Sequence, residues 1–132
     1  MENLNNHITE IIILLFLIIT FLQSGIDKIT DWKGNVSWLK EHFSKTFIKN
    51  VVPIALAKIL VFEVIAGILC IIGIYKLIAE NNITYALYGA ILSCFVLLVL
   101  LLGQRIAKDY DGARTIVIYF VPAIFAVFLL AN

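Results

Sequence analysis

Charged side chains are scarce in this sequence. Asp, Glu, Lys and Arg make up 14% of the 132 residues, whereas 62% are hydrophobic. The mean hydropathy is +1.02. A soluble domain is about half apolar and about a quarter charged, so the composition predicts an integral membrane protein. The net charge of +1 gives no indication of binding to nucleic acid.

Cysteine is nearly absent, and the motifs that use it are missing. Cys70 and Cys94 both lie in apolar stretches, no CxxC occurs, and neither has a neighbouring histidine. Metal binding and dithiol chemistry therefore have no local support. We expect both thiols to be small buried apolar groups without a functional role. The polar N-terminus has no basic region, so we expect no cleaved signal peptide.

Long apolar segments make up most of the sequence. A helix needs about 20 apolar residues to cross a bilayer, and four segments approach or exceed that length: 8–29, 52–78, 83–108 and 112–130. The sequence therefore predicts an all-α membrane protein, a single domain over residues 1–132 built as a bundle of four transmembrane helices.

Polar residues at the segment ends suggest where the helices begin. Asn5 or Asn6 is placed to cap the first span, Asn50 the second and Asp111 the fourth. Pro122 lies inside the fourth span, where it removes a backbone N–H and should bend the helix.

The longest connection, residues 31–50, combines aromatic side chains with lysines. Val36, Leu39 and Phe43 recur at helical spacing. The pattern predicts a short amphipathic helix lying in the headgroup region, between the first two spans. A soluble partner could use the same surface. The aromatic and basic residues are Trp32, Trp38, Phe43, Phe47, Lys33, Lys40, Lys45 and Lys49.

Basic residues in the loops and near the ends of the spans lie almost entirely on one side. Lys76 is the basic residue of the side that holds both termini. Because cytoplasmic loops are enriched in Lys and Arg, loops 31–50 and 105–114 are predicted to be cytoplasmic and both termini outside. The opposite side has Lys28, Lys33, Lys40, Lys45, Lys49, Arg105, Lys108 and Arg114.

Glu63 is the most unusual residue of the chain. It lies about 16 Å along the second span from Val52, near the bilayer midplane, where a carboxylate costs about 2.5–3.5 kcal/mol. Lys58 is five residues away, about 140° around the helix, so the two do not pair. We expect Glu63 to face the bundle interior, with Lys28 as its best-placed cation because Gly25 lets the helices approach.

Further polar groups gather in the same leaflet. We predict that they form a polar site with Glu63 beneath them, and that Arg105 can pair with Asp109 four residues on. One alternative is that Lys58, Arg105 and Lys108 are ordinary boundary cations whose side chains reach the headgroups. Another is that Glu63 belongs to a purely structural buried pair. The candidate site residues are Glu63, Lys28, Lys58, Arg105, Gln104, Tyr119 and Asp27.

Three stretches carry a family resemblance. FLQSGIDKITDW resembles the first-helix signature of the DoxX family, with its Gly-x-x-Lys core at Gly25 and Lys28. LAKILVFEVIAGILCIIGIY is similar to that family's second helix, with a glutamate followed four residues on by a glycine, here Glu63 and Gly67, and a later glycine, Gly73. GQRIAKDYDGA resembles the junction of the third and fourth helices.

The resemblance implies a four-helix bundle in a bacterial inner membrane. Relatives in that family include a membrane subunit of a thiosulfate:quinone oxidoreductase, a subunit of an oxidoreductase complex linked to oxidative stress, and membrane chaperones. It implies a membrane subunit, rather than a catalyst on its own, that binds a quinone or other lipid-like ligand between its helices and serves an oxidoreductase partner. Glu63 and Lys28 would be the central polar groups, with Arg105, Tyr119 and Gln104 as auxiliaries.

Two other functions stay open. The chain could be a non-enzymatic scaffold or assembly subunit of a larger membrane complex, in contact with other membrane subunits or a second copy of itself. A transporter would require an oligomer, because four helices alone do not form a path.

Overall fold

The computed structural model describes residues 2–132, and these residues form helices joined by short turns, without a strand. Four of the helices, α2, α4, α5 and α6, are long and apolar enough to cross a membrane. The structure therefore confirms the all-α membrane fold, with spans close to the predicted bounds. The elements are α1 (Glu2–Asn6), α2 (Ile8–Thr30), α3 (Trp32–His42), the 3-10 turn η1 (Lys49–Val51), α4 (Val52–Glu80), α5 (Thr84–Ile106) and α6 (Tyr110–Ala131).

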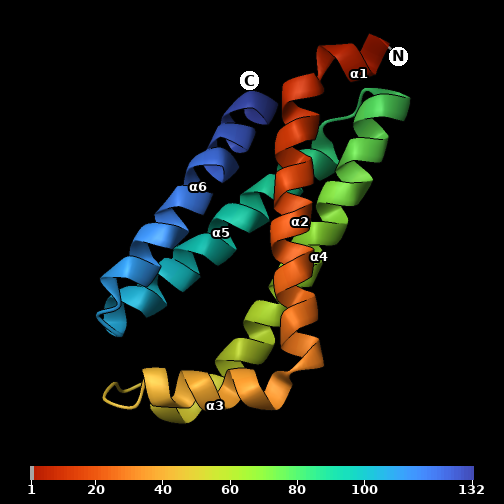
Figure 1. Ribbon diagram of the computed structural model, residues 1–132. Coiled ribbons are helices and arrows are strands. Elements are labelled where there is room, and N and C mark those ends of the chain that lie inside the picture. The colour runs from red at the N-terminus through yellow and green to blue at the C-terminus, as the bar shows by residue number, and fades with distance from the viewer. Residues whose placement is uncertain (1) are drawn as a thin grey trace.

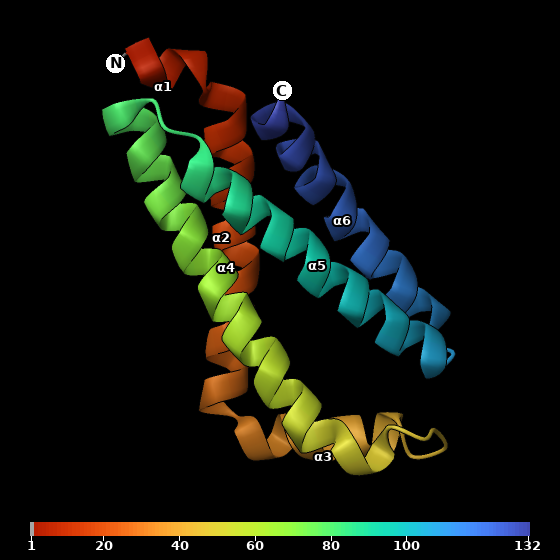
Figure 2. The same ribbon diagram turned by 180° about the vertical axis from the view of Figure 1, so that it is seen from behind.

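The four long helices form two pairs that spread apart toward one end. α2 packs against α4 and α6 against α5, while α4 and α5 connect the pairs. Figures 1 and 2 show α4 and α5 close together beside the turn that joins them, and then diverging. Both termini lie at the closed end of the molecule, and α3 lies across the open end. The predicted bundle is therefore compact at one end only.

Small residues allow the close crossing of α4 and α5. A Cβ atom built on Gly73 would lie 2.5 Å from the Cα of Ala86, and one on Gly89 would lie 3.0 Å from the backbone nitrogen of Cys70. Interfaces between membrane helices favour such residues because they let the two backbones touch. Cys70 and Cys94 are free, buried thiols beside this crossing, as predicted from their apolar surroundings.

Glycines also bring α2 against α4. A Cβ on Gly25 would lie 3.3 Å from Val64, and one on Gly67 would lie 2.5 Å from Leu22. The close approach expected at Gly25 is therefore present. Because Gly25 is one turn before Lys28, it sets the distance from that lysine to α4.

Several helix ends differ from the predicted ones. The residue that caps α2 is His7 rather than Asn5 or Asn6, which belong to the additional short helix α1. α4 begins after Val51, because Asn50 is part of the 3-10 turn η1.

At the start of α6 the predicted cap is wrong by two residues. Asp109 accepts a hydrogen bond from the Gly112 backbone at 2.9 Å, and Asp111 lies in the first turn of the helix. α6 then continues unbroken through Pro122.

The amphipathic segment folds as predicted over its first half. α3 ends at His42, and turns lead from there to η1. Asp31 caps α3 by accepting a hydrogen bond from the Gly34 backbone at 3.3 Å. Trp38 is 58% exposed and Phe47 83% exposed, which suits side chains that lie in a headgroup layer.

Candidate functional site

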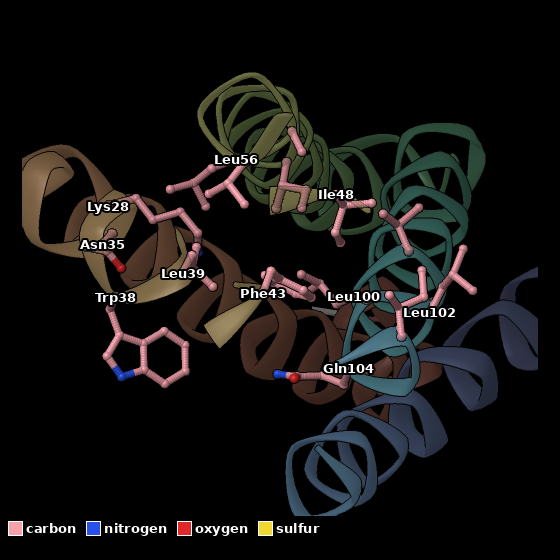
Figure 3. Close-up of a pocket in the computed structure, with 16 residues that line it drawn as sticks. Lys28, Asn35, Trp38, Leu39, Phe43, Ile48, Leu56, Leu100, Leu102 and Gln104 are labelled. Carbon is pink, nitrogen blue, oxygen red and sulfur yellow. The ribbon is translucent and has the colours of Figure 1, made fainter. Parts of the chain in front are cut away.

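A pocket of about 390 Å³ lies at the open end, where α4 and α5 have diverged. α3 and the turn after it close the pocket from outside the bundle, and most of its lining is aliphatic or aromatic (Figure 3). Ligand pockets of 300–1,000 Å³ with a few polar groups in an apolar lining are typical of small-molecule sites. The lining includes Lys28, Asn35, Trp38, Leu39, Phe43, Leu56, Ile59, Leu100 and Gln104.

Behind one wall of the pocket lies the buried ion pair of the structure. The Nζ atom of Lys28 is 2.8 Å from Oε1 of Glu63, whose side chain is only 2% exposed. The pairing expected from the cost of a carboxylate in the membrane is therefore present. α2 contributes Lys28 in its last turn, and α4 contributes Glu63 from its middle. Since Lys28 also lines the pocket, it connects the cavity to the buried acid.

The pair has unused hydrogen-bonding capacity. Lys28 donates a hydrogen bond to Oγ of Ser24 at 2.6 Å, and an ammonium has three N–H donors. Oε1 of Glu63 accepts no hydrogen bond of favourable geometry from any residue between 2 and 132, although Lys28 is near it. Buried polar atoms are normally satisfied. The pair is therefore suited to a further polar partner at the pocket.

The opposite side of the pocket has a second polar cluster. Nε2 of His42 lies 3.0 Å from Oε1 of Gln104 and 3.5 Å from Oδ2 of Asp109. Both neighbours are acceptors, so the ring carries its hydrogen on Nε2 and donates toward them. The amide nitrogen of Gln104 then has no hydrogen-bond partner among the described residues. The cluster joins the end of α3 to the turn between α5 and α6.

Figure 3 shows Lys28 and Gln104 on opposite sides of the pocket, with Leu39 and Phe43 between them. Asn35 lies beside Lys28, but its amide nitrogen already donates to the backbone oxygens of Asp27 and Asp31. Lys28 and Gln104 thus both line the pocket, and each keeps an N–H donor for which the described residues provide no hydrogen-bond acceptor. This arrangement suits an apolar ligand with two hydrogen-bond acceptors.

Four of the predicted site residues lie elsewhere. Asp27, Lys58 and Arg105 are exposed and do not contact the ion pair. Asp27 is on the outer face of α2, because it directly precedes Lys28, which points inward. Lys58 faces outward, as its angular separation from Glu63 implies.

The predicted partnerships of Arg105 and Tyr119 are also absent. The Arg105 guanidinium lies over the Tyr110 ring at 5.0 Å, while Asp109 caps α6, so the expected pair of Arg105 with Asp109 does not form. The ring of Tyr119 packs against Phe16, 6.2 Å between centroids.

Sequence reasoning missed His42 and the pocket role of Trp38. The His42 ring stacks on Trp38 at 4.7 Å between centroids. In the sequence the two residues are four apart, so they share one face of a helix. That spacing was the available signal, but it does not reveal that this face turns toward Gln104.

Comparison with protein-family models, with curated proteins and with solved structures finds no match. Within residues 2–132, no group of three His, Cys, Asp or Glu side chains is placed to hold a metal ion. The fold and the pocket therefore define the class of this protein as a multi-pass helical membrane protein with a buried Lys28–Glu63 pair beside an apolar cavity.

Proposed function

We propose that this protein is a DoxX-like membrane subunit that binds a quinone, or a lipid-like molecule of the same chemistry, in the pocket beneath α3, and that it serves an oxidoreductase partner. The observation that carries the proposal is the position of Lys28, which lines an apolar pocket and contacts the buried Glu63 at 2.8 Å.

The polarity of the pocket suits a quinone. A quinone is a flat apolar ring with two carbonyl acceptors, and the pocket presents two free donors, Lys28 and Gln104, on opposite sides (Figure 3). Trp38, Leu39 and Phe43 supply apolar and aromatic contact surface. The apolar lining strengthens such hydrogen bonds because a low local dielectric increases their electrostatic attraction.

The ion pair supplies proton chemistry at the site. A bound quinone takes up two electrons and two protons when it is reduced, and the partner subunit would supply the electrons. Lys28 holds one proton at Nζ within reach of the pocket, and the Glu63 carboxylate directly behind it stabilises that charge. Lys28 would donate this first proton to the reduced ring, and the second would come from water at the membrane surface through the same lysine. An ammonium positioned next to a carboxylate is a suitable proton donor, and intramembrane ionisable residues are frequently parts of proton relays.

We further propose that the protein lies in a bacterial inner membrane with α3 and the α5–α6 turn toward the cytoplasm and both termini outside. The fold supports this orientation because α3 and the α5–α6 turn share one end of the molecule and the termini share the other (Figure 1). The basic residues at the α3 end then lie on the cytoplasmic side.

The two tryptophans allow a direct test of binding. In the Trp32→Phe variant, Trp38 is the single tryptophan and lines the pocket. Titration of this variant in lipid nanodiscs with a short-chain p-benzoquinone should quench its fluorescence saturably. The matched Trp38→Phe variant retains Trp32, which lies outside the pocket, and should show only linear collisional quenching. Equal linear quenching of both variants would contradict the proposal and favour the scaffold alternative.

A further inference from the structure

A second cavity of about 210 Å³ adjoins the first. Its lining comes from α4 and α5 alone, and three of its residues, Ala55, Ile59 and Val99, line both cavities. The two spaces therefore meet at these three side chains, which we call the neck.

The second cavity lies deeper in the bilayer than the first. Along α4, the lining moves from Val52–Ile59 in the first cavity to Ala55–Phe62 in the second. Along the antiparallel α5 it moves from 99–106 to 95–99. Both shifts point away from α3, by about one helical turn or roughly 5 Å along α4 and by about one and a half turns or roughly 8 Å along α5.

Polarity changes in the same direction. The first cavity contains Lys28, Asn35 and Gln104, whereas the second has Lys58 as its single polar residue. Lys58 is exposed, and its long stem can lie along the apolar wall while its ammonium reaches toward the headgroups. The two cavities together thus have a polar end near the membrane surface and an apolar end below it, the orientation that an amphiphile adopts in a bilayer.

The two cavities and the neck form one continuous groove, which ends at a pair of aromatic rings. Phe62 and Phe95 line the second cavity and contact each other edge to face, 6.1 Å between centroids. Further along, α4 and α5 approach each other until their backbones nearly touch at Cys70 and Gly89, which leaves no space for a chain. The two rings are 38% and 51% exposed, so the groove opens beside them to the lipid.

We propose that the ligand has a single hydrocarbon chain, which runs from the first cavity through the neck and enters the bilayer at Phe62 and Phe95. This inference rests on the proposed function and narrows its ligand to a ring that bears one chain. Because lipid tails are as apolar as the groove, the chain gains little affinity from burial. Its effect is to fix the orientation of the ring between Lys28 and Gln104.

Photolabelling tests the position of the chain. Two probes are p-benzoquinones with a ten-carbon saturated chain and a diazirine at the second or the eighth chain carbon. In nanodiscs, the early diazirine should label the first cavity and the neck, whereas the late diazirine should label Phe62, Phe95 and Val96. Peptide mass spectrometry identifies the labelled residues, and excess short-chain quinone should reduce both signals because it competes for the ring site.

Two tryptophan variants, one that blocks the neck and one that does not, test whether the chain passes through it. Val99→Trp fills the neck and should lower late-probe labelling of Phe62 and Phe95 at least tenfold. Leu98→Trp places the same bulk on the neighbouring exposed position of α5, outside both cavities, and should leave that labelling unchanged. The fluorescence titration in the Trp32→Phe variant, which carries neither of the two added tryptophans, detects binding of the ring separately.

The proposed path of the chain would be wrong, even if the ring binds, if the late probe labelled α2 or α6. It would also be wrong if the late probe labelled the Val99→Trp and Leu98→Trp variants equally. Absence of competed labelling by both probes would overturn the proposed function together with the inference. The two failures are therefore distinguishable.

Discussion

The two ends of this membrane bundle are built in opposite ways. At the closed end, α4 and α5 touch through Gly73 and Ala86, and polar side chains hold the helix termini together. His7 bonds Glu10 at 2.8 Å and Asn81 at 2.6 Å, which ties the start of α2 to the end of α4. At the open end the same helices stand apart, and a pocket, an ion pair and α3 occupy the space.

The difference shows how a small bundle can contain a site. Four helices packed closely along their whole length leave no room for a ligand. The close crossing at one end stabilises the bundle and fixes the angle between α4 and α5, so the other end can remain separated. The polar groups that would be costly among lipid then lie around the separated end, where Lys28 and Glu63 satisfy each other's charge.

The largest expected effect comes from breaking the ion pair at the open end. Lys28→Met leaves the Glu63 carboxylate buried without its cation, which should lower the free energy of unfolding by about 3–5 kcal/mol. Unfolding in mixed SDS and maltoside micelles at pH 7 measures this loss of unfolding free energy. The control Lys33→Met removes an exposed lysine of α3 and should change stability by less than about 0.5 kcal/mol. A loss under about 1 kcal/mol for Lys28→Met would contradict the pairing.

A methyl group added at the closed end should lower the free energy of unfolding, by less than the loss of the ion pair does. A methyl group added at the open end should raise it. Gly73→Ala places a Cβ 2.5 Å from the Ala86 Cα, so the helices must separate, at a cost of about 1–3 kcal/mol. In Gly103→Ala the Cβ meets only Phe43, at 3.7 Å, and the better helix propensity should stabilise by up to about 1 kcal/mol. The same micelle unfolding compares them. Similar effects at both positions would remove the distinction between the ends.

The His42 contact offers a smaller perturbation. His42→Phe keeps a ring to stack on Trp38 but loses the hydrogen bond with Gln104, worth about 1 kcal/mol. Because few other contacts join α3 to α5, the amides of α3 should then exchange with deuterium faster. Those at the closed end serve as the internal control. Unchanged exchange in α3 would show that His42 does not hold α3 over the pocket.

The smallest effect is the pH dependence of the closed end. Hydrogen bonds with Glu10 and Asn81 raise the pKa of His7 above its ordinary 6.5, because the ring must be protonated at both nitrogens to donate to both. A raised folded-state pKa stabilises the protein below about pH 6.5, and this stabilisation disappears as the pH rises through the raised value.

We expect about 0.2–1 kcal/mol for such a partly exposed contact. His7→Gln should remove the difference in unfolding free energy between pH 5.5 and 8.5. If the unfolding free energy differed between the two pH values by the same amount in the variant and in the natural sequence, a group other than His7 would be responsible.

Sequence reasoning predicted the features that depend on local properties. Four apolar runs suffice to place four spans, and the cost of a carboxylate in lipid indicates that Glu63 needs a cation. The spacing of Gly25 and Lys28 then made Lys28 the best candidate. These inferences need only helix geometry and the cost of burying charge.

The pocket could not be predicted in this way. It exists because α4 and α5 diverge beyond the contact of Cys70 with Gly89 and because α3 lies across the gap, and both are properties of the assembled helices. The interpretation of residues 31–50 as an amphipathic segment gave no reason to single out His42, which faces Gln104. Arg105 was misassigned for a related reason, because spacing alone favoured Asp109, whereas α5 ends at Ile106 and Asp109 caps α6.

The central claim is that the Lys28–Glu63 pair serves the pocket rather than the stability of the fold. The most direct measurement combines Lys28→Met with Glu63→Leu in the Trp32→Phe background. Apolar replacement of a whole buried ion pair is often neutral or stabilising, so the melting temperature in nanodiscs should not fall. Our account predicts that saturable quenching of Trp38 by short-chain p-benzoquinone weakens at least tenfold in this folded protein. A folded double variant that binds the quinone as tightly as its parent would contradict the account.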